Sequence, residues 1–257
     1  MCAGHDPTGR AGVDADAEAV QAAGAQAETV VTTDTQQEGT RVLEISPRAE
    51  PEWEALASEA LRRGVRAVKF GLLARAEAVW AASRIARAFG TSPAGAGSAG
   101  SGDPSSWVVV DPVLVATGGE RFLDEAGVEV LRGELIPAGV VLTPNLPELA
   151  ELAGVRLSGL ATDEEARIAA AGRLLELGAR AVCVKGGHGG EDPLVDLVVR
   201  PGAVHSAARP RLAGPGIRGS GCRFASFLAA RGAAGDSLEE ASARAGKWVA
   251  SRIEAGS

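Results

Sequence analysis

The sequence has no long hydrophobic run, no cluster of basic residues and only three cysteines among its 257 residues. A membrane-spanning helix needs about 20 consecutive apolar residues, so we expect none. Cys2, Cys183 and Cys222 lack the spacing of a zinc site or a disulfide framework, which is typical of a reducing compartment. The first ten residues lack the charged and then apolar pattern of a secretory signal. The sequence therefore predicts a cytoplasmic protein.

The charge of the chain also limits its partners. The formal net charge is −7, and the lysines and arginines occur singly or in pairs. Such a surface would repel a nucleic acid or an anionic membrane, so we expect neither as a partner. Hydrophobic residues make up 46% of the sequence, which is enough to bury a full core. We predict one domain over residues 1–257.

Short valine-rich runs alternate with amphipathic stretches rich in Ala, Leu, Glu and Arg. This alternation is typical of an α/β fold with a mostly parallel sheet flanked by helices. The predicted strands are 27–33, 66–70, 107–111, 139–143, 180–185, 194–199 and 203–208. The predicted helices are 13–23, 52–64, 75–88, 122–134, 146–153, 162–177, 221–232 and 237–254.

Three local segments refine this arrangement. Residues 91–106 are mainly Gly, Ser, Ala and Pro, which predicts a flexible insertion between a helix and the next strand. Thr162 and Glu165 form a capping-box pattern, so a helix is expected from residue 162 to Gly178. The glycine-rich turn GHDPTGRAG begins at Gly4, although such a turn normally follows a buried strand. We expect either that this first strand is truncated or that the sheet does without it.

The strongest local signal is Gly219-Ser220-Gly221-Cys222, which a helical stretch follows at once. Two glycines allow a tight turn with its N–H groups on one side, and a helix N-terminus adds partial positive charge. The loop therefore fits an anion such as a phosphoryl group. In the first helical turn the thiol of Cys222 is expected to have a lowered pKa and to accept a proton from a substrate hydroxyl. The same pattern alone also fits an ordinary helix entry with a buried cysteine.

Polar side chains follow three of the predicted strands. Lys185 ends the strand RAVCVK and Asp111 ends WVVVD, while Asn145 and Glu148 begin the helix after the strand at 139–143. Ligands of parallel sheets bind at the carboxyl ends of the strands. A lysine there suits a phosphate, and carboxylates suit Mg²⁺ held through water. Each residue alone also fits a structural role, for example Glu148 as a partner of the helix dipole.

Another polar group lies near the start of the chain. Asp6 and Asp16 flank Gly9 and Gly12, and Gln37 follows the run TVVTT. Groups that donate and accept hydrogen bonds suit a small heterocycle with a ring nitrogen and an amine. Structural roles are an equally open interpretation for each of these residues.

Six stretches, taken in order, resemble the hydroxymethylpyrimidine/phosphomethylpyrimidine kinase family, and the similarity covers nearly the whole chain. The stretches are GHDPTGRAGVDAD, VKFGLL, VVVDPVLVATGGERFL, TPNLPELAEL, AVCVKGGH and GSGC. The resemblance implies a ribokinase-like three-layer α/β/α fold and transfer of the γ-phosphoryl group of ATP, with Mg²⁺, to a hydroxymethyl group. A second transfer to the resulting monophosphate follows in the family, and a homodimer is expected.

The resemblance also implies roles for single residues. Cys222 matches the catalytic cysteine, and the amides of Gly219, Ser220 and Gly221 match the anion hole.

Lys185 and Asn145 match nucleotide-phosphate contacts, and Asp111 and Glu148 match the Mg²⁺ neighbourhood. On the substrate side the matching residues are Gly4, Asp16, Gln37 and Leu73, the last at a position where the family usually has methionine.

The chain departs from the family pattern at three places. Arg10 stands where the family has glycine, and Thr117-Gly118 replaces a Lys-Ser pair. Residues 213–218 read AGPGIR in place of a polar run. Arg218 is expected to compensate as a cation beside the triphosphate.

Three alternatives remain open. A pyridoxal kinase of the same superfamily is the nearest, because some members also have a cysteine in this loop. A catalytically weakened pyrimidine-binding or regulatory protein would explain the altered residues on the nucleotide side. A sugar kinase of the superfamily fits less well, since those enzymes generally have Asp where Cys222 stands.

Overall fold

The computed structural model describes residues 1–38, 41–91, 107–116, 118–189, 192–212 and 216–256. The described strands form one nine-stranded sheet in the order β3-β2-β1-β4-β5-β6-β7-β8-β9. Their bounds are β1 Cys2–His5, β2 Val30–Glu38, β3 Arg41–Pro47, β4 Ala67–Phe70, β5 Trp107–Val110, β6 Val141–Leu142, β7 Ala181–Val184, β8 Leu194–Arg200 and β9 Ala203–Arg209. The single domain remains a prediction.

The six central strands, from β2 through β1 to β7, are parallel, and an antiparallel strand or hairpin extends each edge. From β1 the chain turns first to β2 on one side and then crosses to β4 on the other. The order of the strands therefore reverses between β1 and β4. In open parallel sheets, ligands bind outside the carboxyl ends of the strands at such a switch point.

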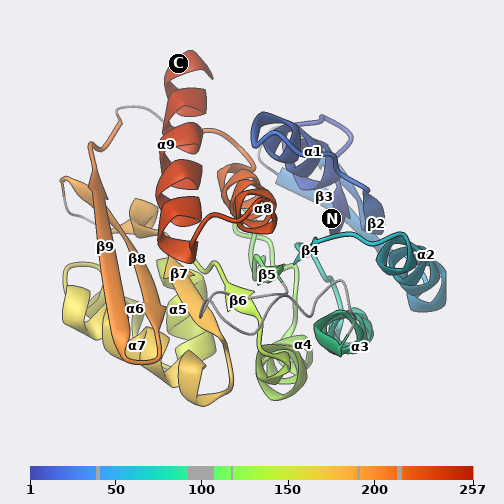
Figure 1. The fold of residues 1–257 in the computed structure, drawn as a ribbon, viewed down its shortest axis with the longest axis horizontal. Coiled ribbons are helices and arrows are strands. Elements are labelled where there is room, and N and C mark those ends of the chain that lie inside the picture. Colours follow the sequence, from blue (N-terminus) through green and yellow to red (C-terminus); the bar gives the residue numbers. More distant parts are fainter. Residues whose placement is uncertain (39–40, 92–106, 117, 190–191, 213–215, 257) are drawn as a thin grey trace.

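Helices cover both faces of the sheet, which gives the three layers seen in Figure 1. Their bounds are α1 Gly12–Ala22, α2 Glu50–Arg62, α3 Ala76–Thr91, α4 Glu125–Val130, α5 Leu146–Ala153, α6 Leu157–Leu160, α7 Glu164–Glu176, α8 Ser220–Ala233 and α9 Leu238–Gly256. Residues of α1, α8 and α9 share one hydrophobic core, and residues of α2, α3, α4, α5 and α7 share the other.

Strand β5 shows why both faces are covered. Val108 and Val110 belong to one core, whereas Trp107 and Val109 belong to the other. Successive side chains of a strand point to opposite faces, so a run of four apolar residues requires a helix layer on each side. The predicted three-layer α/β/α arrangement with a mostly parallel central sheet is confirmed.

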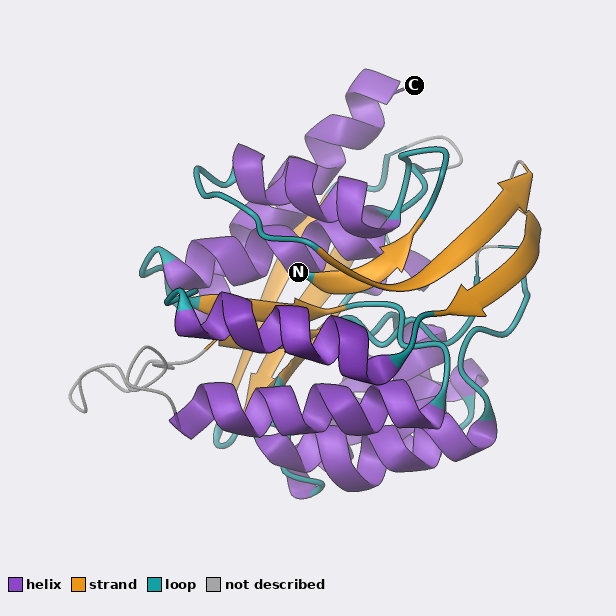
Figure 2. Ribbon diagram, turned by 90° about the vertical axis from the view of Figure 1, so that its right-hand side faces the viewer, coloured by secondary structure: helices purple, strands orange, loops and turns teal. Residues whose placement is uncertain are grey.

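Two strands, β1 and β3, were not predicted from the sequence. Cys2–His5 form β1, which pairs with both β2 and β4, so the sheet does not do without a strand before the glycine-rich turn. Strand β2 runs on to Glu38 and pairs with β3 in an antiparallel hairpin. In Figure 2 this hairpin extends away from the helices. The sequence did not predict this hairpin, because the run after Thr33 is polar and a hairpin that extends into solvent needs no apolar face.

Several predicted boundaries need correction. The helix expected at 122–134 begins only after Asp124, whose side chain caps Gly127 N, and it continues as a π-helical and a 3₁₀ segment to Ala138. The predicted strand 139–143 is reduced to β6. The cap of α7 is Asp163 and not Thr162, since the Asp163 carboxylate accepts the hydrogen bond from Ala166 N. The predicted insertion at 91–106 falls almost entirely outside the described residues.

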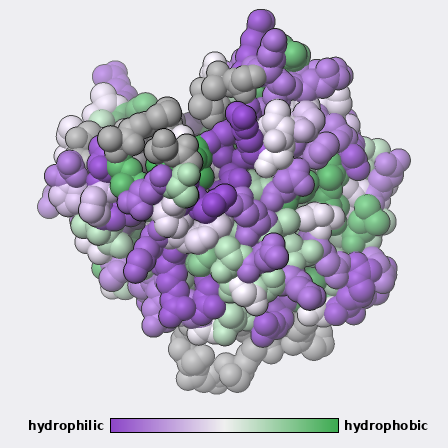
Figure 3. Space-filling model, turned by 90° about the horizontal axis from the view of Figure 1, so that it is seen from above, coloured by the Kyte–Doolittle hydropathy of each residue, from purple (hydrophilic) through white to green (hydrophobic). Residues whose placement is uncertain are grey.

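In the part of the chain that the structure describes, no helix is long and apolar enough to cross a membrane. The face shown in Figure 3 is mostly hydrophilic, with hydrophobic residues in small groups. The large hydrophobic side chains are otherwise collected in the two cores on either side of the sheet.

Candidate active site

Asp111 and Lys185, which the sequence singled out, meet Lys69 at the carboxyl edge of the sheet. Lys69, Asp111 and Lys185 lie at or directly after the ends of β4, β5 and β7. The N-terminus of α8 lies over the same edge, because a Cβ atom added to Gly221 would be 3.0 Å from Lys185 Nζ and 3.6 Å from both Asp111 carboxylate oxygens. Strand order, and not sequence distance, brings these groups together.

Asp111 and Lys185 form an ion pair beneath this helix end. Lys185 Nζ donates to Asp111 Oδ1 at 2.7 Å, and both side chains are largely buried. Burial alone would raise the pKa of Asp111, but the charges of Lys185 and Lys69 outweigh it and hold the pKa below its usual value. Burial alone would lower the pKa of Lys185, and the Asp111 carboxylate reverses that effect. Both groups are therefore charged at neutral pH.

The loop before α8 packs closely against the backbone of Arg10. Gly219 has φ 73°, and a Cβ atom there would lie 2.5 Å from the carbonyl oxygen of Arg10. Both facts require glycine at this position. The helix begins at Ser220, so the N–H groups of Gly221 and Cys222 have no partner within the helix. Such N–H groups at a helix N-terminus are suited to an anion.

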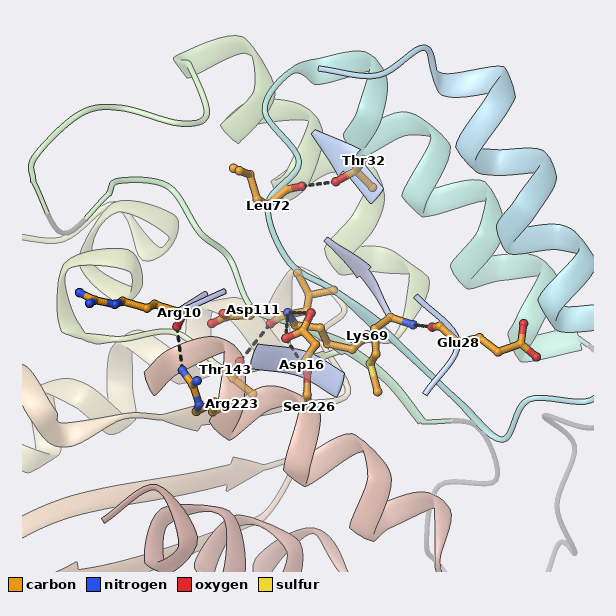
Figure 4. A network of polar contacts seen from close by, with 12 residues as sticks. Arg10, Asp16, Glu28, Thr32, Lys69, Leu72, Asp111, Thr143, Arg223 and Ser226 are labelled. Atoms are coloured by element: carbon orange, nitrogen blue, oxygen red, sulfur yellow. Dashed lines mark hydrogen bonds and ion pairs between the residues drawn. The ribbon is translucent and has the colours of Figure 1, made fainter. Parts of the chain in front are cut away.

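Arg223 ties this loop to the glycine-rich turn near the start of the chain. Its Nη1 donates to the carbonyl oxygens of Arg10 and Arg218, each at 2.8 Å, and its Nε donates to Glu18 Oε2. The bond to Arg10 is drawn in Figure 4. The two glycine-rich segments, more than 200 residues apart in sequence, therefore share one rigid connection.

The thiol of Cys222 lies between Asp111 and the backbone N–H of Gly12. The pKa of this thiol is raised to about 12. Burial is the largest cause, the charge of Lys69 lowers the pKa, and the carboxylates of Asp111 and Asp16 raise it. The expectation of a lowered pKa was wrong. The helix dipole that suggested it is outweighed by burial and by two carboxylates.

Asn145 and Glu148 form the capping box of α5. Asn145 Oδ1 accepts from Glu148 N at 2.9 Å, and Glu148 Oε2 accepts from Asn145 N at 2.8 Å. Burial raises the pKa of Glu148 to about 8, Lys185 lowers it, and Asp111 raises it again. Glu148 and Asp111 are thus two buried acidic groups, and the charge of Asp111 disfavours ionisation of Glu148.

Two neighbouring carboxylates fit Mg²⁺, which is often held by one or two of them together with water and substrate phosphates. Among the described residues, no group of three or more His, Cys, Asp or Glu side chains could hold a metal ion. A metal held by protein groups alone is therefore not the arrangement that these residues favour.

A fully buried ion pair lies next to the thiol. Lys69 Nζ contacts both carboxylate oxygens of Asp16, at 2.8 and 2.9 Å, and Ser226 Oγ donates to Asp16 Oδ1 at 2.8 Å. Figure 4 shows how these three side chains point toward one another. Ser226 lies one helical turn after Cys222, so both face the same side of α8. Neither Lys69 nor Asp16 is exposed. The contact of Asp16 with a substrate stays a prediction.

The family model described as phosphomethylpyrimidine kinase matches residues 6–257. The chain belongs to this family. The predicted family and the predicted class of enzyme, a phosphotransferase, are confirmed.

Curated relatives and solved structures resemble this chain over nearly its whole length. The thiamine biosynthesis bifunctional protein ThiED of Geobacter sulfurreducens is 36% identical over 98% of this chain, which spans only 48% of that protein. The hydroxymethylpyrimidine/phosphomethylpyrimidine kinase of Streptomyces coelicolor is 35% identical, with 99% of this chain and 87% of that protein covered. The solved pyridoxal kinase of Staphylococcus aureus in complex with ADP has a TM-score of 0.82 and 27% identity, and covers 98% of this chain and 86% of its own.

The other residues predicted for the substrate side lie on β1, β2 and the segment after β4. Gln37 Nε2 donates to Thr35 Oγ1 at 2.7 Å, while Gln37 Oε1 is buried with no partner among the described residues. A Cβ atom on Gly4 would lie 2.8 Å from Leu72 Cδ2. Leu73, which matches the family pattern, is buried in the larger core. The residue in contact with Gly4 is its neighbour Leu72.

Arg218 does not extend freely toward a nucleotide. Its Nε lies 3.4 Å from Asp6 Oδ2, and its side chain is 18% exposed. Asp6 in turn accepts hydrogen bonds from the backbone and hydroxyl of Thr8. Two other departures from the kinase pattern, Thr117 and residues 213–215, lie outside the described residues.

Three functional neighbours were missed from the sequence. Lys69 stands inside the buried strand AVKF, and a lysine in a core strand was the available signal, since such a residue is almost never buried without a partner. Ser226 and Arg223 gave no such signal. Their partners lie 210 and 213 residues away, in contacts that only the fold creates.

Proposed function

We propose that this chain catalyses the ATP-dependent phosphorylation of hydroxymethylpyrimidine and then of its monophosphate, in thiamine biosynthesis. The observation that carries the proposal is the meeting of Cys222, the N–H groups of α8 and the Asp111–Lys185 pair at one edge of the sheet. The names of the relatives supply the substrate and the pathway. The ADP complex of the pyridoxal kinase supports ATP as the phosphoryl donor.

In phosphoryl transfer the protein mainly positions the reactants and neutralises charge. The amides of Gly219, Ser220 and Gly221 are proposed as the anion hole for the transferred group, because they lie at the N-terminus of α8 and the N–H of Gly221 has no partner within the helix. The N–H of Ser220 also donates to the carbonyl oxygen of Ile217 at 3.3 Å. Lys185 is proposed to contact the nucleotide phosphates. Its ammonium lies directly beneath Gly221, where a phosphate on the loop would meet it.

Asp111 and Glu148 are proposed to hold Mg²⁺, and Asn145 to orient Glu148 through the capping box. A Mg²⁺ ion held there would supply positive charge that offsets the two acidic groups and the phosphates. Arg218 is proposed to orient Asp6 at the edge of the glycine-rich turn, and through it to act near the triphosphate.

On the substrate side, the unpartnered Gln37 Oε1 is proposed to accept a hydrogen bond from the amine of the pyrimidine. An acceptor that is buried without a donor is costly, so a ligand amine would relieve that cost. Gly4 and Leu73 are proposed to contact the flat ring, and the missing side chain of Gly4 lets Leu72 pack directly against the backbone there. Asp16 contributes indirectly, because it holds Lys69 next to the thiol.

Cys222 is proposed to take the proton of the attacking hydroxyl at its Sγ atom. Burial and the carboxylates of Asp111 and Asp16 raise the pKa of this thiol, and Lys69 lowers it. The thiol therefore has to release its own proton to solvent before Sγ can accept one from the hydroxyl, and positive charge of a bound Mg-nucleotide beside Asp111 would favour that release. General base catalysis of this kind contributes on the order of 10²–10⁴ to a rate.

The test is ADP release by purified protein with Mg-ATP and hydroxymethylpyrimidine, its monophosphate or pyridoxal in parallel. We expect turnover of both pyrimidines, and a Cys222→Ala variant that loses about 10²–10⁴ in kcat while it still binds the pyrimidine. Equal losses in turnover and binding would contradict the role of Cys222. Serine at the same position is the matched control, because it keeps the size of the side chain.

A pyridoxal kinase is the second candidate, favoured by the fold and identity shared with the Staphylococcus aureus enzyme. A preference for pyridoxal in the same assay would establish it. Tight pyrimidine binding without turnover would instead favour the weakened binding protein. The homodimer and the cytoplasmic location remain predictions, and light scattering of the purified protein tests the first.

A further inference from the structure

Arg10 stands in the glycine-rich turn directly beside the anion loop. Its carbonyl oxygen accepts a hydrogen bond from Arg223 Nη1 at 2.8 Å, and a Cβ atom on Gly219 would lie only 2.5 Å from the same oxygen. Gly9 and Gly12 on either side have φ 68° and 64°. The backbone of Arg10 is therefore fixed against the loop that begins α8.

The side chain of Arg10, unlike its backbone, is not held against the loop. It is exposed, and in Figure 4 its guanidinium points away from Arg223 and from the Lys69–Asp16 pair. No carboxylate in the described part of the chain lies within ion-pair distance of it. The side chain is long enough to swing over the N–H groups of Gly221 and Cys222, since its own backbone touches the loop that carries them.

The other cations of the site are already neutralised. Lys69 pairs with Asp16, Lys185 with Asp111, and Arg218 with Asp6. A phosphate monoester brings a charge of about −1.5 to −2 at neutral pH, which these pairs do not balance. The unphosphorylated pyrimidine brings no such charge. A substrate with a phosphate therefore needs a cation that is not already held by a carboxylate.

We propose that Arg10 binds the phosphate of the pyrimidine monophosphate and so favours the second phosphoryl transfer over the first. This inference rests on the proposed function, and it names a specificity residue that the family pattern, with glycine at this position, does not contain. A guanidinium can donate two parallel hydrogen bonds to a phosphate, which gives both affinity and orientation. Since the alcohol substrate lacks the phosphate, Arg10 leaves its binding unchanged.

The test compares Arg10→Gln, which keeps length without charge, and Arg10→Gly, which restores the family residue. Steady-state kinetics with each pyrimidine gives separate KM values for the alcohol and the monophosphate. We expect KM for the monophosphate to rise about tenfold, the equivalent of losing 1.4 kcal/mol, with KM for the alcohol unchanged. Arg66→Gln is the matched control, because Arg66 is also exposed but precedes β4 at the opposite edge of the sheet.

Ionic strength gives an independent readout. Salt should raise KM for the monophosphate in the wild-type protein more steeply than in Arg10→Gln, because the contact is between exposed charges. Equal effects of Arg10→Gln on both substrates, or none on either, would overturn the proposal.

Binding of the monophosphate, measured by titration calorimetry without ATP, separates this idea from the proposed function. Weaker binding by Arg10→Gln supports the contact even if no turnover is found, and unchanged binding rejects it even if the kinase activity is real.

Discussion

Replacement of Lys69 by methionine tests whether the buried ion pair holds the site together. Lys69→Met leaves the Asp16 carboxylate with no solvent exposure and with Ser226 Oγ as the hydrogen-bond donor that remains. Removal of one partner of a buried pair costs about 3–5 kcal/mol, because the other charge stays buried without compensation. Native proteins have only about 5–15 kcal/mol of stability, so this single change should remove a large part of it.

The double variant Asp16→Leu/Lys69→Met is the control, because it shows whether the loss of stability in Lys69→Met comes from the unpaired charge of Asp16. Replacement of a buried pair by apolar side chains of similar size is often neutral. The hydroxyl of Ser226 then loses its acceptor, which costs about 1–3 kcal/mol. We therefore expect the double variant to be more stable than Lys69→Met alone.

Urea unfolding at pH 7, followed by tryptophan fluorescence, measures both variants, since Trp53 and Trp107 are buried. A cost below about 1 kcal/mol for Lys69→Met, or a double variant no more stable than the single one, would refute the reasoning.

Two further outcomes follow from burial. The pKa of Glu148 is raised from 4.5 to about 8, so between these values the folded protein keeps this proton while the unfolded chain has lost it. The free energy of unfolding should therefore fall as pH rises through that window, by up to about 1.4 kcal/mol per pH unit. Urea midpoints from pH 5 to 8.5 measure this fall, and Glu148→Gln should remove that part of the slope. A Cβ atom on Gly232 of α8 would lie 2.2 Å from the Trp107 ring, so Gly232→Ala should cost about 1–3 kcal/mol. In contrast, Gly172→Ala in α7, where a Cβ atom meets nothing, should stabilise by up to about 1 kcal/mol, and thermal melts that show the same sign for both would contradict the packing argument.

The sequence predicted the parts of the fold that depend on local pattern. Apolar runs such as WVVV identify buried central strands, because residues on both faces must be hydrophobic. The positions of Asp111 and Lys185 followed from the same rule, since the carboxyl ends of parallel strands share one edge. The hairpin of β2 and β3 did not follow, because its outer part is polar and its pairing depends on register rather than on composition.

The candidate site was predicted only as far as single elements could show it. Each of Cys222, Asp111 and Glu148 ends a strand or begins a helix, which is visible in the sequence. The pairing of Lys69 with Asp16 joins residues 53 positions apart, and both side chains are buried in it. Such pairings come from the order of strands in the sheet, which local patterns do not contain.

The state of the Cys222 thiol shows which physical effect the sequence argument underestimated. A helix N-terminus stabilises a neighbouring anion by about 0.3–1 kcal/mol, and by up to about 2 kcal/mol when partly buried. Full burial can shift the pKa of an ionisable group by 3–5 units, which corresponds to several kcal/mol. The larger effect prevails, and the carboxylates of Asp111 and Asp16 act in the same direction. The helix N-terminus at Gly219–Gly221 is therefore too weak to make Cys222 a thiolate against burial and the two carboxylates.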